Sequence, residues 1–175
     1  MGVRYAVAPA EASGLEDESV DLVTVAQALH WFDHDAFYAE VRRVARPGCV
    51  IAAWTYTLAN VRDAAEGPVN EIIQSFYAEM APWWPPERAH VEAGYRTIPF
   101  PFEPIDAPAF EMRATWPAER LVGYFGTWSA VLRYRRQTGH DPLEPLTARL
   151  REAWPDPAEA KDIRWPIAMR IGRAR

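Results

Sequence analysis

The apolar residues of the first third of the chain fall into short runs that predict strands. Residues 20–25 form a nearly continuous apolar run rich in β-branched side chains, which predicts a strand buried on both faces, as in a parallel sheet. Residues 49–56 predict the next strand, and residues 3–7 a short strand at the N-terminus. With a helix between the two longer strands, this order indicates an α/β fold with a parallel crossover.

The segment between those strands carries the signals of an amphipathic helix. Asp33 is a suitable N-cap, and Phe32 and Phe37 occupy the two positions of a hydrophobic staple. Apolar residues then recur at helical spacing up to Ala45, and Pro47-Gly48 is expected to end the helix.

The rest of the chain has a different pattern, mostly helical and rich in Pro and Trp. Pro68 can open a helix that reaches Met80, and residues 81–86 predict an irregular aromatic loop. The later elements are a strand at 109–116, helices at 117–125, 127–137 and 141–154, and a last strand at 162–171. Pro166 favours an edge position for that last strand.

These patterns predict three regions. Residues 1–60 form a Rossmann-like core, residues 61–158 a helical lid and substrate region with one strand, and residues 159–175 a strand that returns to the sheet.

Composition narrows the function classes. The 175 residues carry a net charge of -5, which does not suit binding to nucleic acid or anionic membranes. No apolar run approaches the length of a membrane span, and the start of the chain has no signal-peptide pattern. Cys49 is the only cysteine, so no intrachain disulfide forms, which suits a cytoplasmic protein. We expect Cys49 to be a small buried hydrophobic residue.

The end of the 20–25 strand is the best site candidate. Small residues, an amide, an imidazole and an indole follow one another there, and ligands of open α/β sheets bind at the carboxyl ends of strands. His30 has two interpretations, a hydrogen-bonded structural histidine or a general base. His30 and His34 are four residues apart, but an N-cap at Asp33 leaves His30 outside the helix, so we expect no metal site.

A set of motifs in residues 5–57 resembles the class I S-adenosylmethionine (SAM) dependent methyltransferases, and more narrowly the branch with trans-aconitate-type and other small-molecule enzymes. The motifs are Ala10-Glu11, Asp17-x-Ser19-Val20-Asp21-Leu22-Val23, Ala26-Gln27-Ala28-x-His30-Trp31-Phe32-Asp33 and Glu40-Val41-x-Arg43-Val44-x-Arg46-Pro47-Gly48. The resemblance implies a Rossmann-like sheet with the SAM pocket at the carboxyl ends of its strands.

The resemblance also implies residue roles. Ala10, Glu11 and Ala12 would lie beside the adenine, and Ala26, Gln27 and Ala28 beside the sulfonium. His30 and Trp31 would face the acceptor. These roles make physical sense, because methyl transfer mainly needs positioning and an aromatic face suits a cationic sulfonium.

One departure from the family pattern concerns the cofactor. The family's first strand ends in a Gly-rich loop and its second in an acidic residue that binds the ribose, but only nine residues precede Ala10 and no Gly-x-Gly occurs. We therefore expect an incomplete, N-terminally truncated sheet that lacks its first two strands, with weak or lost SAM binding. The exposed edge of the 20–25 strand would be covered by residues 3–7, by the Pro/Trp-rich region or by a second chain.

Two functions remain open. The first is a SAM-dependent methyltransferase of a small-molecule acceptor, with a carboxylate among the candidates. The second is a non-catalytic truncated relative that forms a homodimer across the exposed sheet edge. Trp83, Trp84 and Trp128 fit core or lid packing better than a substrate wall, and Arg133, Arg135 and Arg136 form a solvated face unless one of them holds an anionic acceptor.

Overall fold

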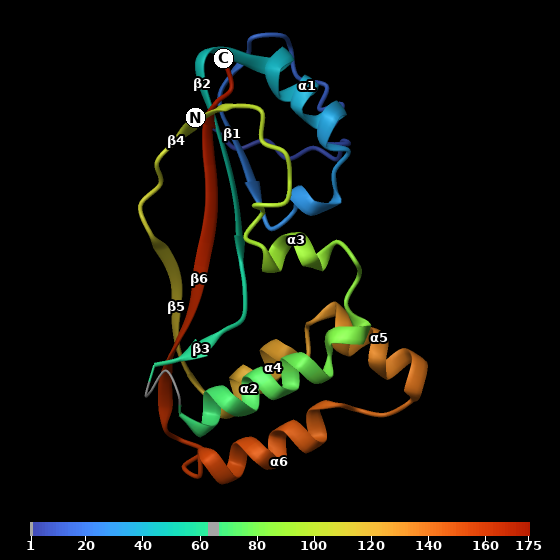
Figure 1. Ribbon diagram of the computed structural model, residues 1–175, viewed down its shortest axis with the longest axis vertical. Coiled ribbons are helices and arrows are strands. Elements are labelled where there is room, and N and C mark those ends of the chain that lie inside the picture. The colour runs from blue at the N-terminus through green and yellow to red at the C-terminus, as the bar shows by residue number, and fades with distance from the viewer. Residues whose placement is uncertain (1, 63–66) are drawn as a thin grey trace. The chain divides into compact units, whose positions relative to one another are not determined.

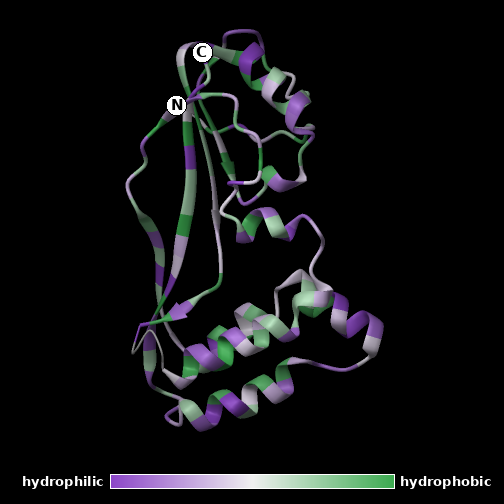
Figure 2. Ribbon diagram, viewed as in Figure 1, coloured by the Kyte–Doolittle hydropathy of each residue, from purple (hydrophilic) through white to green (hydrophobic). Residues whose placement is uncertain are grey.

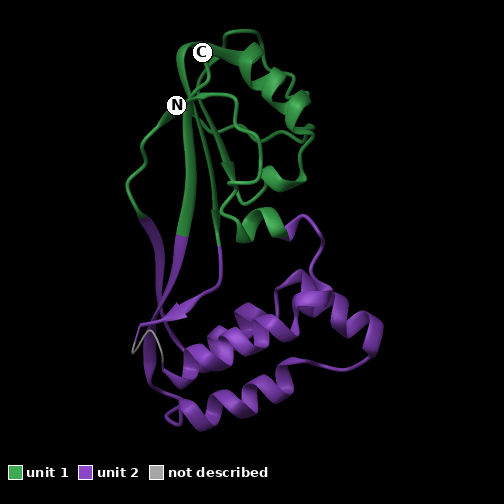
Figure 3. Cartoon of the chain, in the orientation of Figure 1, with its two compact units in different colours: residues 1–56, 89–109, 167–175 green, residues 57–88, 110–166 purple. Residues whose placement is uncertain are grey.

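The computed structural model describes residues 2–62 and 67–175 (Figure 1). The chain divides into two compact units (Figure 3). Unit 1 contains residues 1–56, 89–109 and 167–175, and unit 2 contains residues 57–88 and 110–166. The sequence analysis grouped residues 89–109 with the lid, whereas their contacts place them in unit 1.

Unit 1 is built on a mixed sheet. Strand β1 (Val20–Ala26) pairs in parallel with β2 (Ala45–Tyr56), which confirms the parallel crossover through helix α1 (His34–Val44). Strand β2 pairs antiparallel with the second half of β6 (Ala160–Arg173), which in turn pairs with the short β4 (Glu103–Ile105). The α/β fold class is therefore confirmed.

The start of α1 follows the sequence prediction. The Asp33 carboxylate accepts a hydrogen bond from the Ala36 backbone N–H at 3.2 Å, as an N-cap does. The rings of Phe32 and Phe37 lie 4.8 Å apart, which confirms the staple. Through Phe37, Tyr38 and Val41, α1 contributes to the apolar core of unit 1, together with β2 and the segment after α3 (Arg88–Glu92).

Two predictions for the beginning of the chain are wrong. Residues 3–7 form no strand, and Tyr5 is 94% exposed. Strand β1 is not buried on both faces, since Leu22 is 57% exposed and only Val25 is fully buried. The reason is that β1 pairs with β2 alone among the described strands and forms the edge of the sheet.

Unit 2 is mainly helical. Its elements are β3 (Asn60–Val61), α2 (Pro68–Glu79), the 3₁₀ turn η2 (Ala81–Trp83), β5 (Phe110–Pro117), α4 (Ala118–Phe125), α5 (Ser129–Thr138) and α6 (Leu143–Ala153). Figure 2 shows hydrophobic and hydrophilic residues alternating along these helices, as their predicted amphipathic patterns require. Gly139 ends α5 with a φ of 75°, the left-handed conformation typical of helix C-termini.

The last strand has a more central place than predicted. Strand β6 pairs with β2, β3, β4 and β5, so the expected edge position is wrong. Pro166 falls between the ladders that β6 forms with β3 and with β2. The pairing with β3 involves Ile163 and Arg164, and the pairing with β2 begins at Ile167.

No helix in the described ranges is both long enough and apolar enough to cross a membrane.

Candidate functional site

The site begins where β1 ends. The backbone after Ala26 turns sharply at Gln27, which has a φ of 54°. Left-handed backbone is uncommon for a non-glycine residue. Such a conformation persists only where the surrounding structure holds the residue in place, and it is found more often at functional sites.

Hydrogen bonds to β2 hold Gln27 in this conformation. Its side-chain Oε1 accepts hydrogen bonds from the Thr55 hydroxyl at 2.8 Å and from the Tyr56 backbone N–H at 2.9 Å. Its backbone N–H donates to the Trp54 carbonyl at 2.9 Å. Gln27 thus extends the β1–β2 pairing with its side chain, so its amide is engaged with β2.

His30 and Trp31 follow on the 3₁₀ turn η1 (Leu29–Trp31) and differ in exposure. The His30 side chain is buried, with 9% exposed, and its Nδ1 lies 3.1 Å from the Tyr95 hydroxyl. Trp31 is 57% exposed, and its ring centroid lies 4.6 Å from that of His30. The buried imidazole of His30 therefore lies next to the exposed indole of Trp31.

The Ala10–Ala12 segment is fastened beside this turn. The Glu11 carboxylate accepts a hydrogen bond from the Asp33 backbone N–H at 3.1 Å. Ala10 and Ala28 both pack against the core of unit 1, whereas Ala12 is exposed. The fold thus links two segments to which the resemblance assigned the cofactor and the acceptor, although they are about twenty residues apart.

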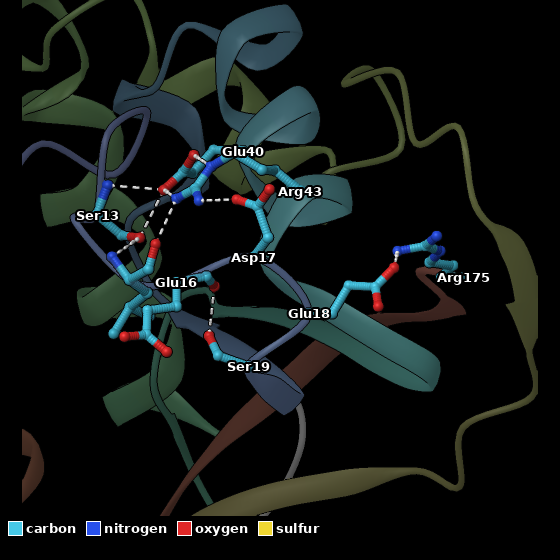
Figure 4. A network of polar contacts seen from close by, with 9 residues as sticks. Ser13, Glu16, Asp17, Glu18, Ser19, Glu40, Arg43 and Arg175 are labelled. Atoms are coloured by element: carbon cyan, nitrogen blue, oxygen red, sulfur yellow. Dashed lines mark hydrogen bonds and ion pairs between the residues drawn. The ribbon is translucent and has the colours of Figure 1, made fainter.

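A polar network attaches the loop that follows Ala12, residues 13–19, to helix α1 (Figure 4). Glu40 on α1 accepts from the Ser13 backbone N–H at 2.9 Å and from Arg43 at 2.7 and 2.8 Å. Arg43 also donates to Asp17 at 2.6 Å and to the Leu15 carbonyl at 2.8 Å. Hydrogen bonds from Arg43 and then from Ser13 lower the pKa of Glu40 to about 2, and the Glu40 carboxylate raises the pKa of Arg43.

Tyr95 is a site residue that the sequence reasoning missed. Its side chain is fully buried and contacts His30 from 65 residues further along the chain. The only local signal was Gly94 beside it, which is common at sharp turns and gave no hint of the partner.

Other candidates have structural partners. His34 Nε2 donates to the Leu29 carbonyl at 3.1 Å, and no cluster of three or more metal-binding side chains occurs within residues 2–62 and 67–175. Arg135 makes a two-pronged ion pair with Asp141, at 3.0 and 2.8 Å. Cys49 is buried, which raises the pKa of its thiol.

Two of the tryptophans of unit 2, Trp84 and Trp128, belong to an aromatic cluster. The ring of Trp84 lies 5.5 Å from Trp128, and the Arg88 guanidinium lies 4.5 Å above Trp84. Trp128 is buried and also stacks on Phe76 at 5.9 Å. Packing accounts for these contacts.

Two cavities lie away from the candidate residues. One, of about 580 Å³, lies in unit 2 and is lined mainly by residues of α4 and α6. The other, of about 410 Å³, lies in unit 1 beside Phe100, Phe102 and Arg170. Neither is lined by a residue that the sequence analysis assigned to the site.

Comparison with known proteins gives the site a family context. Residues 1–53 match the family described as a methyltransferase domain, and this range includes all eight residues assigned to the site from the sequence. Tyr95 lies outside it.

Relatives extend the similarity over nearly the whole chain. A solved structure from Anaeromyxobacter dehalogenans, described as a type II methyltransferase, is 51% identical, has a TM-score of 0.88, and aligns with 98% of this chain and 72% of its own. A Dictyostelium discoideum protein named as a methyltransferase is 27% identical over 98% of this chain and 66% of its own length. An uncharacterized methyltransferase of Mycobacterium tuberculosis is 45% identical over 64 residues, 36% of this chain and 24% of its own.

The present chain thus spans about two thirds of the Dictyostelium protein and somewhat more of the Anaeromyxobacter one. The identity to the Anaeromyxobacter protein, together with the matching fold and the domain match, establishes the relationship. The chain belongs to the class I SAM-dependent methyltransferases.

Proposed function

We propose that this chain takes part in SAM-dependent methyl transfer to a small-molecule acceptor, with the end of β1 as the reacting side of the site. The observation that carries the proposal is the arrangement of Gln27, His30 and Trp31. At the end of β1, Gln27 has a strained backbone and is hydrogen-bonded to β2. The buried imidazole of His30 and the exposed indole of Trp31 lie side by side just after it, within the segment that matches the methyltransferase domain.

The residues present fit one end of SAM better than the other. Ala26 and Ala28 are small enough for a ligand to approach the backbone, and the exposed Trp31 ring suits a cationic sulfonium. The chain contains no Gly-x-Gly sequence, and the Glu11 carboxylate is already bonded to the Asp33 N–H. The chain therefore has residues suited to contact the sulfonium end of SAM, and fewer residues suited to bind its ribose.

When bound, SAM supplies an electrophilic methyl group on a positively charged sulfur. The chain's own part is positioning. Gln27 fixes the end of β1, Glu11 holds its loop against the N-cap of α1, and Trp31 offers an aromatic wall. His30 is the group suited to orient the acceptor or take its proton, since an imidazole does both near neutral pH. A small-molecule acceptor suits the acidic balance of the chain, whose net charge of -5 disfavours nucleic acid.

A calorimetric titration of the 175-residue chain with SAM tests the proposal. We expect weak binding, with a dissociation constant of about hundreds of micromolar. Trp31→Ala should weaken it about two- to fivefold, because an exposed cation–aromatic contact contributes about 0.5–1 kcal/mol. Phe110→Ala, which removes an exposed aromatic side chain from β5, is the matched control and should leave the affinity unchanged. Absence of binding at about millimolar SAM would contradict the proposal.

The second candidate function is a non-catalytic relative that self-associates. The observation in its favour is the free edge of β1, where Leu22 is exposed and no described strand pairs. A second copy offers the same edge, and two identical edges can pair about a twofold axis. A stable dimer in sedimentation, combined with no SAM binding, would favour this candidate over the first.

A further inference from the structure

We propose that the cavity of about 410 Å³ in unit 1 binds a small carboxylate with a flat apolar body, and that the guanidinium of Arg170 holds the carboxylate group. The residues at the end of β1 do not line this cavity, so it is a second site, and the inference does not depend on methyl transfer. Most of the lining is apolar and includes Phe100, Phe102, Ile105, Met169 and Ile171.

The cavity lies where β4 leaves β6. The pairing of these two strands ends at Ile105 opposite Ile171, and the chain after β4 then bends away from β6 (Figure 1). At Gly172 the two strands are packed closely, because a Cβ atom there would lie 2.7 Å from the Phe102 Cβ. The wall that contains Phe102 is therefore pressed against the strand that carries Arg170, which gives the cavity a defined shape.

The guanidinium of Arg170 is fixed by contacts within unit 1. Its Nη1 donates to the Tyr95 carbonyl at 2.9 Å and also to that of Ile98. Its central carbon lies 4.6 Å from the centroid of the Phe100 ring, where a cation and an aromatic face attract each other. A side chain that is already held in this way loses little further freedom when a ligand binds, which favours affinity.

The rest of the guanidinium is available to a ligand. The two carbonyls occupy Nη1, whereas Nε and Nη2 of Arg170 have no acceptor within residues 2–62 and 67–175. Neither of these nitrogens is fully sealed from solvent. Together, Nε and Nη2 form the side of the arginine fork that can donate to both oxygens of one carboxylate.

The charge of Arg170 also lacks a carboxylate to balance it. The residue forms no ion pair in the part of the chain that the structure describes, and burial lowers its pKa. Burial also raises the pKa of Tyr38 to about 12, so this neighbouring phenol stays neutral. The acid on the cavity lining is Asp106, which is exposed and does not bond to Arg170. A carboxylate ligand supplies the missing charge, and the apolar lining suits a flat hydrocarbon body.

The experiment is a titration of the full chain with benzoate, followed by NMR of its backbone amides and methionine methyl groups. We expect a dissociation constant of about 1 mM, with the largest shifts at Ile105, Met169 and Arg170. Benzamide has nearly the same shape but no charge, and should bind at least about tenfold more weakly. Equal binding of benzoate and benzamide would overturn the proposal, because the cavity would then hold any flat apolar molecule.

Two variants test the cavity without removing the bonds of Arg170. Asp106→Asn removes the acid from the lining, so benzoate should bind about two- to threefold more tightly. Asp35→Asn removes an exposed acid from α1 and is the matched control, which should leave the affinity unchanged. Ala107→Trp places a large side chain on the lining and should weaken binding about tenfold, because the cavity is then filled.

Arg170→Lys tests the arginine itself. It retains the charge but not the fork, so benzoate should bind at least about fivefold more weakly. If this variant does not fold, Asp106→Asn and Ala107→Trp decide, and native affinity in both would overturn the proposal. The largest shifts at Trp31 would also overturn it, because benzoate would then bind at the end of β1. No SAM is added, so failure of the proposed function leaves this result untouched.

Discussion

At the scale of single residues, the site depends on polar groups whose partners are far away in sequence. Gln27 bonds to Thr55 and Tyr56, and His30 to Tyr95. Both Gln27 and Tyr95 have a positive φ. The sequence marked Gln27 and His30 as candidates, but their partners emerge only when β1, β2 and the turn after α3 come together.

Gln27→Ala should destabilise the protein by about 1–3 kcal/mol, because the substitution leaves the Tyr56 N–H and the buried Thr55 hydroxyl without their acceptor. Chemical denaturation measures the change. Gln74→Ala, at an exposed position of α2, is the matched control and should change stability by less than about 0.5 kcal/mol. A loss below that level in Gln27→Ala would mean that water replaces the amide.

At the scale of elements, local signals determine where α1 begins and a network determines where the preceding loop lies. The N-cap at Asp33 and the staple of Phe32 on Phe37 are within one turn of each other, so the sequence predicted them correctly. The Ser13–Glu40 bond spans 27 residues and attaches the loop to α1. No local pattern of residues predicted this bond.

This network should make stability depend on acidic pH. The folded-state pKa of Glu40 is about 2, below its ordinary 4.5, so its contribution is complete above 4.5 and is lost as the pH falls toward 2. We expect urea midpoints to fall between about pH 5 and pH 3, and to fall less steeply in Glu40→Gln.

Glu16→Gln is the control for that comparison, since Glu16 is an exposed carboxylate of the same loop. It should retain the native pH dependence. If Glu40→Gln and the native chain lose stability in parallel as the pH falls, Glu40 does not carry the acid sensitivity.

At the scale of the whole molecule, the chain passes more than once between two units, and each unit has its own core. Strand β6 contributes its first half to unit 2 and its second half to unit 1, changing at Pro166. The edge of the sheet in unit 1 is β1, whose outer side has no partner among the described strands.

The exposed edge predicts how the chain behaves in solution under the second candidate function. If β1 edges pair, Leu22→Lys should shift the chain from dimer to monomer in sedimentation equilibrium, because a lysine on an edge strand opposes edge-to-edge pairing. Leu132→Lys, at a comparably exposed position of α5, should leave the dimer intact. A dimer that persists in Leu22→Lys does not form through β1.

The sequence by itself determined most of the longer elements, the cap of α1, the α/β class and the segment that carries the methyltransferase motifs. Those features depend on residues within a turn or a strand of one another, so periodicity and capping chemistry reveal them. Only the tertiary structure decided that residues 3–7 do not cover the edge of β1, that β6 lies between other strands, and that Tyr95 meets His30. These depend on which strand edges and turns meet across long separations, and no local pattern encodes that choice.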